Sequence, residues 1–281
     1  MRKINLIGKR FVKLCVLDGK YDRSVGYVKW RCKCDCGNVT NVIGANLRRG
    51  YVNSCGCERN RKSGERLLEN KYGRRYKIDE HYFDKIDTAE KAYWLGFIYA
   101  DGYNYVKKYT IAVNLAVKDK HLLIRLRAAI GYTGKIFHRK SGKCGGVVLR
   151  FASKHMSTHL RNIGMVQAKS LILKFPSTDV LPRGVESHFI RGYFDGDGTV
   201  NKNGSLMSIL GTKIFLVKLR KILMENCKLN STKLHRFGKI YSLGYGGNTQ
   251  MARIFNYLYK DAPFYLERKR TRFLKNVRIF I

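Results

Sequence analysis

The chain has 281 residues, with 56 Lys and Arg against 20 Asp and Glu, which gives a formal net charge of +36. This length is enough for one or two domains with sizeable cores, and the charge indicates a polyanionic partner. The longest apolar run, Ala92–Ala100, is far shorter than the ~20 residues that cross a bilayer. Basic residues are interleaved with 18 tyrosines along the whole chain, which favours nucleic acid over a membrane surface.

Residues 1–60 are predicted to form a small cysteine-rich unit, with strands over Arg10–Leu17 and Gly26–Cys34. Five of the eight cysteines lie within this unit, which favours a metal site in a reducing compartment over disulfides. A unit of this size also needs such a staple to fold. Its 13 basic residues against 4 acidic ones suit a DNA-gripping role, although pure scaffolding is the alternative.

Two matching Cys-x-Cys pairs are the predicted zinc ligands. They can offer four thiolates to one tetrahedral Zn²⁺. Cys32 is an alternative to the first of them, and the spacing does not decide between the two. The unit is similar to short zinc-binding modules at the N-termini of some phage-type nucleases. The predicted ligands are Cys34, Cys36, Cys55 and Cys57.

Residues 61–80 carry many charges and little apolar periodicity, and are predicted to be a basic linker that either follows a phosphate backbone or is simply solvated. A helix is then predicted to begin at Asp87, which forms a capping box with Glu90, and to end at Gly102. The remaining chain is divided into two repeats, residues 81–178 and 179–281.

Each repeat begins with a similar nine-residue stretch. Trp94-Leu-Gly-Phe-Ile-Tyr-Ala-Asp-Gly102 is followed much later by Ile190-Arg-Gly-Tyr-Phe-Asp-Gly-Asp-Gly198. In each stretch two small residues are four positions apart, so on a helix they share one face and allow a close helix–helix approach. The predicted interface residues are Gly96, Ala100, Gly192 and Gly196.

Packing the two helices on each other would bring Asp101 and Asp197, at their C-terminal ends, almost into contact. Two adjacent carboxylates stay ionised only if cations neutralise them, and oxygen ligands of this kind suit Mg²⁺. The backbones of Gly102 and Gly198 are further candidate ligands. A metal-dependent, phosphodiester-cleaving site is therefore predicted here.

After each motif the same pattern returns: two strands, a helix, two strands and a helix. In the first repeat the first strand pair is predicted over Tyr103–Val117 and the first helix over Lys118–Ile130. The next two strands are predicted over 135–139 and 146–152, and the last helix over Lys154–Ile163. In the second they are predicted over Thr199–Leu210, Thr212–Cys227, 233–237 with 239–245, and Thr249–Leu258. The predicted fold is α+β: a duplicated α-β-β-α-β-β-α core with pseudo-twofold symmetry and saddle-shaped antiparallel sheets, plus the small zinc-stapled β unit.

The sheets are expected to form one saddle over a DNA duplex, with polar and basic side chains on it contacting phosphates more often than bases. The candidates in the first repeat are Tyr103, Asn104, Tyr105, Lys107, Lys108, Arg139 and Arg150. Those in the second are Asn201, Lys202, Asn203, Lys233, His235, Arg236, Lys239 and Tyr241. Three single cysteines and four histidines show no ligand spacing and are assigned structural roles: Cys15, Cys144, Cys227, His121, His155, His159 and His188.

Both nine-residue stretches resemble the signature helices of the LAGLIDADG homing endonucleases, and the resemblance covers residues 81–281. It implies that Asp101 and Asp197 bind the catalytic Mg²⁺ and that the two helices join two α/β halves. Asp195 stands at the motif's other acidic position, where the first copy has Tyr99, and is assigned no chemistry.

Two lysines follow the motifs at nearly equal distances, Lys169 after Asp101 and Lys269 after Asp197. They resemble the lysines that accompany the motif carboxylates in intein-type members of the family, where the ammonium is thought to polarise the attacking water or stabilise the pentacovalent phosphate. The alternative is that both simply contact DNA phosphates.

The resemblance implies a monomeric, intracellular, site-specific endonuclease of a bacterial or phage-type host. Such an enzyme makes staggered double-strand breaks in a long DNA target and supports mobility of its encoding element. The cofactors expected are catalytic Mg²⁺ and structural Zn²⁺, and the partner is double-stranded DNA. Two alternatives keep the same fold: an intron RNA maturase, or a DNA-binding regulator that has lost cleavage.

Overall fold

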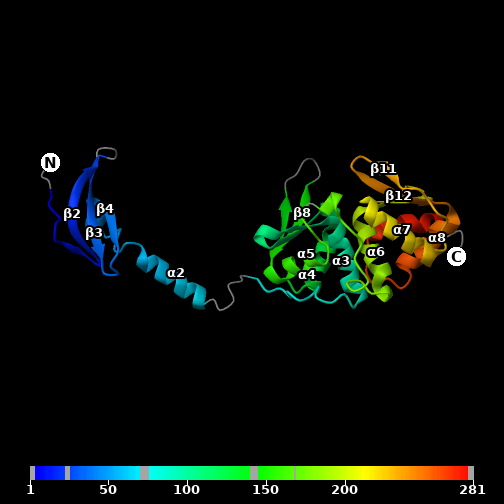
Figure 1. Cartoon of the computed structure of the whole chain (residues 1–281), viewed down its shortest axis with the longest axis horizontal. Coiled ribbons are helices and arrows are strands. Elements are labelled where there is room, and N and C mark those ends of the chain that lie inside the picture. The colour runs from blue at the N-terminus through cyan, green and yellow to red at the C-terminus, as the bar shows by residue number, and fades with distance from the viewer. Residues whose placement is uncertain (1–3, 23–25, 70–75, 140–144, 168, 278–281) are drawn as a thin grey trace. The chain divides into compact units, whose positions relative to one another are not determined.

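The computed structural model describes residues 4–22, 26–69, 76–139, 145–167 and 169–277. The chain forms two compact units, Met1–Arg75 and Tyr76–Ile281, each with its own hydrophobic core (Figure 1). The division falls inside the predicted linker, but part of that linker is helical, since α2 spans Cys57–Glu69. Ion pairs of Arg61 with Glu58 and Glu65, one helical turn away on either side, support α2 in place of apolar periodicity.

The first unit is one antiparallel sheet, in the order β1-β2-β3-β4, followed by short helix α1 and by α2. Trp30 on β3 is the largest side chain of its core. The indole is held between two glycines, because a Cβ at Gly19 or Gly44 would lie 2.6 or 2.7 Å from its ring atoms. The elements are β1 Arg10–Phe11, β2 Leu14–Asp22, β3 Tyr27–Cys34, β4 Val39–Ile43 and α1 Gly44–Arg48.

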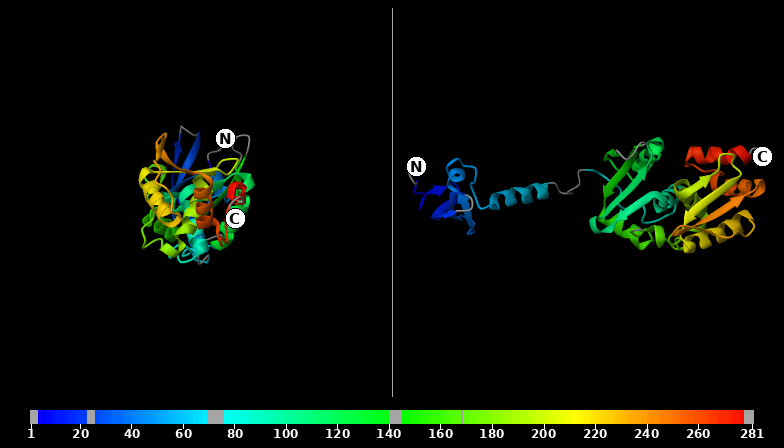
Figure 2. Two further views of the ribbon diagram at one scale, coloured as in Figure 1. Left: turned by 90° about the vertical axis from the view of Figure 1, so that its right-hand side faces the viewer. Right: turned by 90° about the horizontal axis from the view of Figure 1, so that it is seen from above.

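The second unit is built twice on one plan, with two four-stranded antiparallel sheets of equivalent order, β5-β6-β8-β7 and β9-β10-β12-β11. Figures 1 and 2 show one sheet in each half of this unit, with α3 and α6 at the junction. The first half contains α3 Ala89–Asp101, β5 Gly102–Tyr105, β6 Thr110–Leu115, α4 Lys120–Ala129, β7 Ile136–Arg139, β8 Gly146–Ala152 and α5 Lys154–Asn162.

The second half repeats this order and adds a helix, α9, that pattern reading did not predict. It contains α6 Glu186–Asp197, β9 Gly198–Val200, β10 Leu206–Gly211, α7 Lys213–Cys227, β11 His235–Phe237, β12 Ile240–Gly246, α8 Asn248–Tyr259 and α9 Glu267–Val277. The predicted α+β fold with duplicated antiparallel sheets is confirmed.

The start of α3 differs in detail from the prediction. Thr88, not Asp87, is the N-cap, and its hydroxyl accepts a hydrogen bond from the Lys91 amide at 3.2 Å. Asp87 instead pairs with the Lys91 ammonium at 3.1 Å. At the other end Gly102 has φ of −80°, so it is required for close packing and not for a left-handed turn: a Cβ there would lie 2.4 Å from the Ile98 carbonyl oxygen.

One continuous apolar core runs through both halves of the second unit and includes nearly all of α3. Residues 92–100 of this helix are buried on every side, as expected of a helix at the centre of a domain. Within the described part of the chain, no helix combines the length and apolarity needed to cross a membrane.

Candidate active site at the helix crossing

Glycines let α3 and α6 cross with their backbones in direct contact. A Cβ on Gly96 would lie 2.0 Å from the Phe189 carbonyl oxygen, and a Cβ on Gly192 would lie 2.0 Å from that of Tyr93. The two contacts are reciprocal, as a pseudo-twofold axis between the helices requires. Even alanine does not fit at either position without separating the helices.

The crossing directs the C-terminal ends of both helices to one place, where Asp101 and Asp197 are half-buried. Gly196 lies between them: a Cβ there would lie 2.3 Å from Ala100 Cβ and 3.2 Å from Asp101 Oδ2. The four predicted interface residues therefore all lie along the crossing or at its end.

Burial raises the pKa of Asp101 to about 6, and the charge of Asp197 acts in the same direction. Burial also raises the pKa of Asp197, although the charges of Lys169 and Lys269 oppose this. The ionised pair is therefore costly in the absence of a cation. Two adjacent, partly buried carboxylates supply the negative charge and the oxygen ligands that suit Mg²⁺.

Each of the two sequence-predicted lysines caps the end of a motif helix. Lys169 Nζ donates to the carbonyl oxygens of Ala100 and Gly102 at 2.7 and 2.6 Å. Lys269 Nζ, which is buried, donates to those of Phe194, Asp195 and Gly196 at 2.7, 2.6 and 3.1 Å. The last carbonyls of a helix lack intrahelical partners and carry its negative dipole end, so an ammonium is well placed there.

Lys169 lies beside the carboxylate of the opposite motif helix. It is attached to the end of α3, yet it lines a pocket with Asp197, whose charge raises the Lys169 pKa more than that of Asp101 does. For Lys269 the charge of Asp195 acts most strongly, and the charge of Asp101 acts more strongly than that of Asp197. Burial is the dominant influence on both, and it lowers the pKa of Lys269 to about 8. Sequence spacing pairs each lysine with the motif that precedes it, so the position of Lys169 beside Asp197 was missed.

Two cavities reflect the same arrangement. Asp101 lines a cavity of about 530 Å³ together with Asn114 and Arg139 of the first half and Arg268 of α9. Asp197 lines a smaller one of about 150 Å³, with Lys169 and residues of β10 and β12. Each carboxylate thus belongs to a pocket built from both halves of the unit.

Tyr99 and Asp195, the sixth residues of the two nine-residue motifs, each hold the segment that carries a lysine. The Tyr99 hydroxyl donates to the Ile163 carbonyl, six residues before Lys169. Asp195 accepts from the Leu266 amide at 2.7 Å, three residues before Lys269. Asp195 is fully buried and also accepts from two tyrosine hydroxyls, so its role is structural, in keeping with the absence of any assigned chemistry.

A second pair of anchors crosses between the halves, and sequence reasoning did not find it. Asp119, the N-cap of α4, forms a two-pronged ion pair with Arg268, at 3.2 and 3.1 Å, next to Lys269. Thr212, the N-cap of α7, donates through Oγ1 to the Leu173 carbonyl at 2.5 Å, close to Lys169. Each lysine-bearing segment is therefore attached to both halves.

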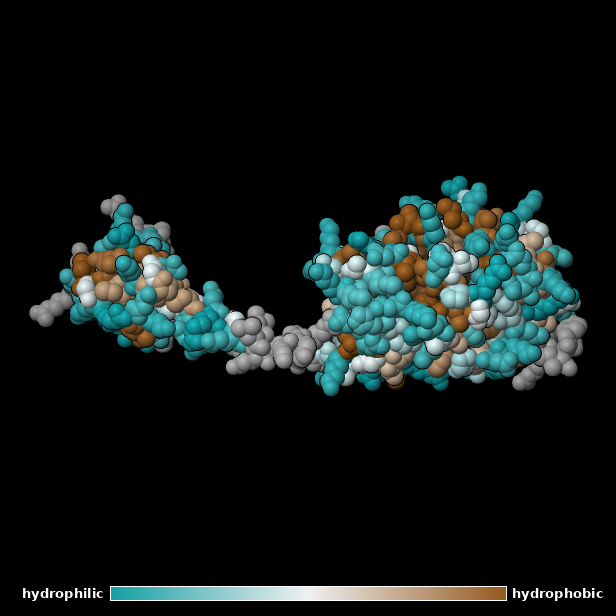
Figure 3. Space-filling view, turned by 60° about the horizontal axis from the view of Figure 1, so that its bottom comes forward, coloured by the Kyte–Doolittle hydropathy of each residue, from teal (hydrophilic) through white to brown (hydrophobic). Residues whose placement is uncertain are grey.

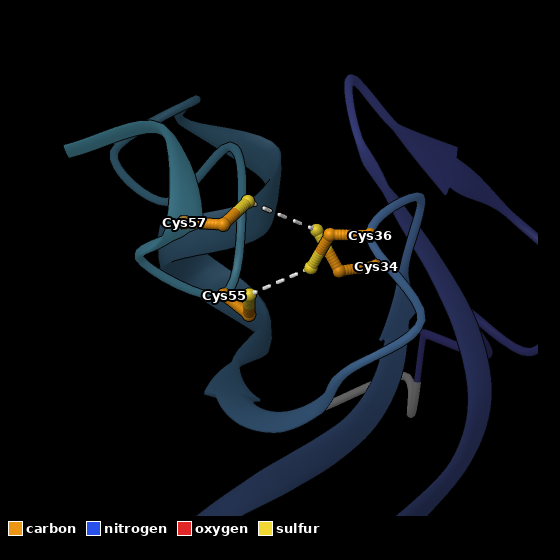
Figure 4. Close-up of side chains that lie close together, drawn as sticks. All are labelled: Cys34, Cys36, Cys55 and Cys57. Atoms are coloured by element: carbon orange, nitrogen blue, oxygen red, sulfur yellow. Dashed lines mark hydrogen bonds between the residues drawn. The ribbon is translucent and has the colours of Figure 1, made fainter. Parts of the chain in front are cut away.

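In the first unit the four predicted cysteines converge (Figure 4). The Sγ atoms of Cys34 and Cys57 are 3.7 Å apart, and those of Cys36 and Cys55 are 3.3 Å apart. These separations exceed a disulfide bond and approach the ~3.8 Å between sulfurs around a tetrahedral zinc with Zn–S bonds of ~2.3 Å.

Two of the four thiols are shifted toward the thiolate and two away from it. The backbone amides of Cys36 and Cys55 lower the pKa of the Cys34 thiol to about 6, and the Cys57 amide lowers that of Cys55. For Cys36 the Asn38 amide acts in the same direction, but the Cys55 thiol and burial outweigh it and raise the pKa to about 12; burial also raises that of Cys57. Cys32 lies outside the cluster, with its thiol buried and donating to the Trp30 carbonyl. Four convergent sulfurs with amide support fit a structural Zn²⁺ site.

Strand register decides which DNA-facing candidates share a surface. Tyr103, Tyr105, Arg139 and Arg150 all lie on the outer face of the first sheet, opposite its core. In the second half His235 lies on the outer face, and exposed basic residues surround the strands. These are Lys202, Lys233 and Lys239, matched in the first half by Lys107 and Lys108. Arg236 is exposed on β11 itself, and its pairing with Tyr241 puts it on the face opposite His235. Figure 3 shows hydrophilic side chains over most of the drawn face of this unit.

Two of the candidates, Asn104 and Tyr241, are placed differently from the prediction. Asn104 is buried on the inner face, where its amide donates to the Ser157 and Met165 carbonyls, so the prediction of a DNA contact fails. Tyr241 also lies on the inner face, half-buried against the core. Asn201 and Asn203 are exposed, but their side chains close the β9–β10 turn through Ser205.

No family model matches the sequence, and no curated protein matches it. Similar folds occur among solved structures. The LAGLIDADG meganuclease I-AabMI bound to uncleaved DNA is 14% identical, with a TM-score of 0.45 over 66% of this chain and 90% of that one. Full-length DUF199/WhiA from Thermatoga maritima is 15% identical, with a TM-score of 0.46 over 72% and 66%. I-SmaMI bound to cleaved DNA is 16% identical, with a TM-score of 0.45 over 66% and 86%. At this level of likeness, function has to be argued from the residues of the chain itself.

We expect Asp101→Asn to stabilise the metal-free protein at neutral pH. The folded pKa of about 6 lies above the ordinary 3.8, so the ionised side chain opposes folding above about pH 6. The neutral amide removes this cost, on the order of 1–2 kcal/mol after allowance for solvent access. Thermal unfolding in EDTA should show a gain at neutral pH that fades as the pH falls from about 6 to about 4. An equal gain at every pH would contradict the electrostatic explanation.

Loss of one clustered cysteine should abolish zinc binding by the first unit. Cys36→Ser or Cys55→Ser leaves three sulfurs, and the small core around Trp30 then lacks its staple. Metal analysis after dialysis is expected to show one zinc fewer per chain, with loss of structure in this unit by NMR. Cys15→Ser is the matched control and should retain the zinc. Equal zinc content in Cys36→Ser and Cys15→Ser would rule out this ligand set.

Proposed function

We propose that the second unit is a metal-dependent DNA endonuclease of the LAGLIDADG type that cuts both strands of a long target. The observation that carries this proposal is the crossing of α3 and α6, which brings together Asp101 and Asp197, each faced by a lysine. Two related pockets of this kind suit the two antiparallel strands of a duplex. Staggered cleavage that supports mobility of the encoding element is the corresponding biological role.

In this proposal Asp101 and Asp197 hold Mg²⁺, which supplies a polarised phosphate and charge stabilisation for the attacking and leaving oxygens. The carboxylates also fix the distance between the two reaction centres, because neither can move without separating the helices at Gly96 and Gly192. Partial burial weakens the screening by water and so strengthens the interaction of the pair with a phosphate-bound cation.

The two lysines differ in how much hydrogen-bonding capacity they keep. An ammonium has three protons. Lys269 donates to three carbonyls, so its protons are all used and it acts by positioning and by charge. Among the described residues Lys169 donates to two carbonyls, which leaves one proton for a water or phosphate beside Asp197. Lys169 is therefore the better candidate for a direct catalytic contact.

The charge of the chain supports DNA as the partner. Basic and aromatic side chains occupy the outer face of the first sheet and the turns around both sheets. Most of these groups would contact phosphates, which gives salt-sensitive binding with little sequence information. The first unit, with its proposed structural Zn²⁺, adds further basic surface, and its role in this scheme is either to grip DNA or to support the fold.

A protein that only binds nucleic acid, such as a transcriptional regulator or an intron maturase, is the second candidate. It would need the basic surface but not the paired carboxylates, whose charges oppose a phosphate backbone. Partly buried carboxylates with a raised pKa at the centre of the unit favour a catalytic site over a binding surface alone.

Cleavage is the direct test of the proposed function. A library of duplexes that contains the joined flanks of the gene is incubated with the protein in Mg²⁺ and, separately, in Ca²⁺. We expect staggered double-strand cuts in Mg²⁺ only. Asp101→Asn and Asp197→Asn should bind the same duplex with unchanged salt dependence but without cutting. Binding without cutting by the wild-type protein, on every duplex tested, would favour the regulator or maturase.

Substitution of the lysines should affect the two strands unequally. Lys169→Met removes the free N–H beside Asp197, so we expect one strand to be cut roughly 10²-fold more slowly and nicked duplex to accumulate. Lys269→Met leaves three buried carbonyls without a donor, so we expect lower thermal stability first. Single-turnover cleavage of end-labelled duplex separates the strands. Weaker DNA binding with unchanged cleavage rates in both variants would show that the two lysines only contact phosphates and take no part in catalysis.

A further inference from the structure

Three side chains that were assigned no ligand role gather on the surface of the second unit. His81 Nδ1 lies 2.7 Å from Asp84 Oδ2, and His155 Nε2 lies 2.7 Å from Oδ1 of the same carboxylate. His81 and Asp84 belong to the segment that leads into α3, and His155 belongs to the first turn of α5. One ligand atom from each of the three lies within 4.8 Å of the others.

The separations are close to those of a coordinated metal. Ligand atoms ~2.0–2.1 Å from a tetrahedral zinc are ~3.3 Å apart, so outward shifts of about half an ångström convert the hydrogen-bonded set into a chelate. The two imidazole rings have centroids 4.2 Å apart and are tilted by 48°, so both present a nitrogen to the same space beside the carboxylate.

A third histidine lies next to the cluster. His159 is one helical turn after His155 on α5, and the two rings stack with centroids 6.3 Å apart. Two histidines four residues apart on one helix face are a recurring arrangement for binding a transition metal. Two of the seven histidines of the chain therefore contact a single carboxylate, and a third lies beside them, in a protein where basic residues far outnumber acidic ones.

We propose that His81, Asp84 and His155 bind a divalent transition metal such as Zn²⁺. Imidazole nitrogens with one carboxylate suit zinc, cobalt, nickel and copper, and they do not suit Mg²⁺. The site is separate from both the cysteine cluster and the paired aspartates. A bound ion would fasten the segment that enters α3 to α5, and it would stabilise the fold by mass action.

The competing explanation uses the same atoms. With a proton on His81 Nδ1 and on His155 Nε2, both rings donate to Asp84, and the cluster is an ion-pair and hydrogen-bond network without metal. The two explanations differ in the response to pH and to metal. A metal site binds its ion with release of protons and loses it in acid, whereas the hydrogen-bond network does not respond to added metal.

Cobalt binding to the full-length protein distinguishes the two explanations, because thiolate ligands give an intense charge-transfer absorption that imidazole and carboxylate ligands do not. We expect one Co²⁺ in the cysteine cluster and a second one that adds no thiolate absorption. His81→Ala, Asp84→Asn and His155→Ala should each weaken binding of the second ion by at least about tenfold and leave the thiolate absorption unchanged.

His121→Ala, an exposed histidine outside the cluster, is the matched control and should bind cobalt as the wild type does. His155→Gln keeps a polar side chain of similar size and replaces the alanine variant if that variant does not fold. Zn²⁺ should also raise the melting temperature of the control but not of the cluster variants. Equal cobalt stoichiometry and affinity in the control and in all cluster variants would overturn the proposal in favour of the hydrogen-bond network.

Discussion

The backbone contact of α3 with α6 at Gly96 and Gly192 is the constraint on which the second unit depends. Because two helices meet without intervening side chains, both C-terminal ends leave the core at the same place. Two carboxylates and two sets of unpaired carbonyls then accumulate there, and each group is costly to bury alone. The ammonium groups of Lys169 and Lys269 donate hydrogen bonds to those carbonyls. The close packing of the helices is therefore the reason that positive charge is needed at this place.

The anchors around the lysines make the two halves interdependent. Each lysine-bearing segment is attached to its own motif helix, through Tyr99 or Asp195, and to the opposite half, through Thr212 or Asp119. A shift of one half against the other would therefore move a lysine relative to the carboxylate that it faces. This couples the relative position of the two sheets to the geometry around the two carboxylates.

Sequence periodicity predicted much of this fold because the duplication is visible in the sequence: strands, helices and motif helices recur in one order, and small residues mark the crossing. Sequence periodicity did not predict α2 and α9, because both helices are rich in charged residues and have few apolar ones. It could not find that Lys169 lies beside Asp197, because separation along the chain does not say which half a side chain faces. It also misplaced Asn104, since the alternation of β5 could be settled only by its register with β6.

The two halves hold equivalent lysines by different means, and the second half uses more buried charge. Arg191 is fully buried and donates to the Phe264 and Leu258 carbonyls at 2.7 and 2.9 Å, and Asp195 fixes the neighbouring Leu266 amide. Apolar side chains would fill this space at lower cost, because buried charges lose their hydration. The charged groups instead hold the backbone of residues 258–266 in one conformation, and this conformation determines the position of Lys269. The buried polar network is therefore better explained by the precision that the site requires than by stability.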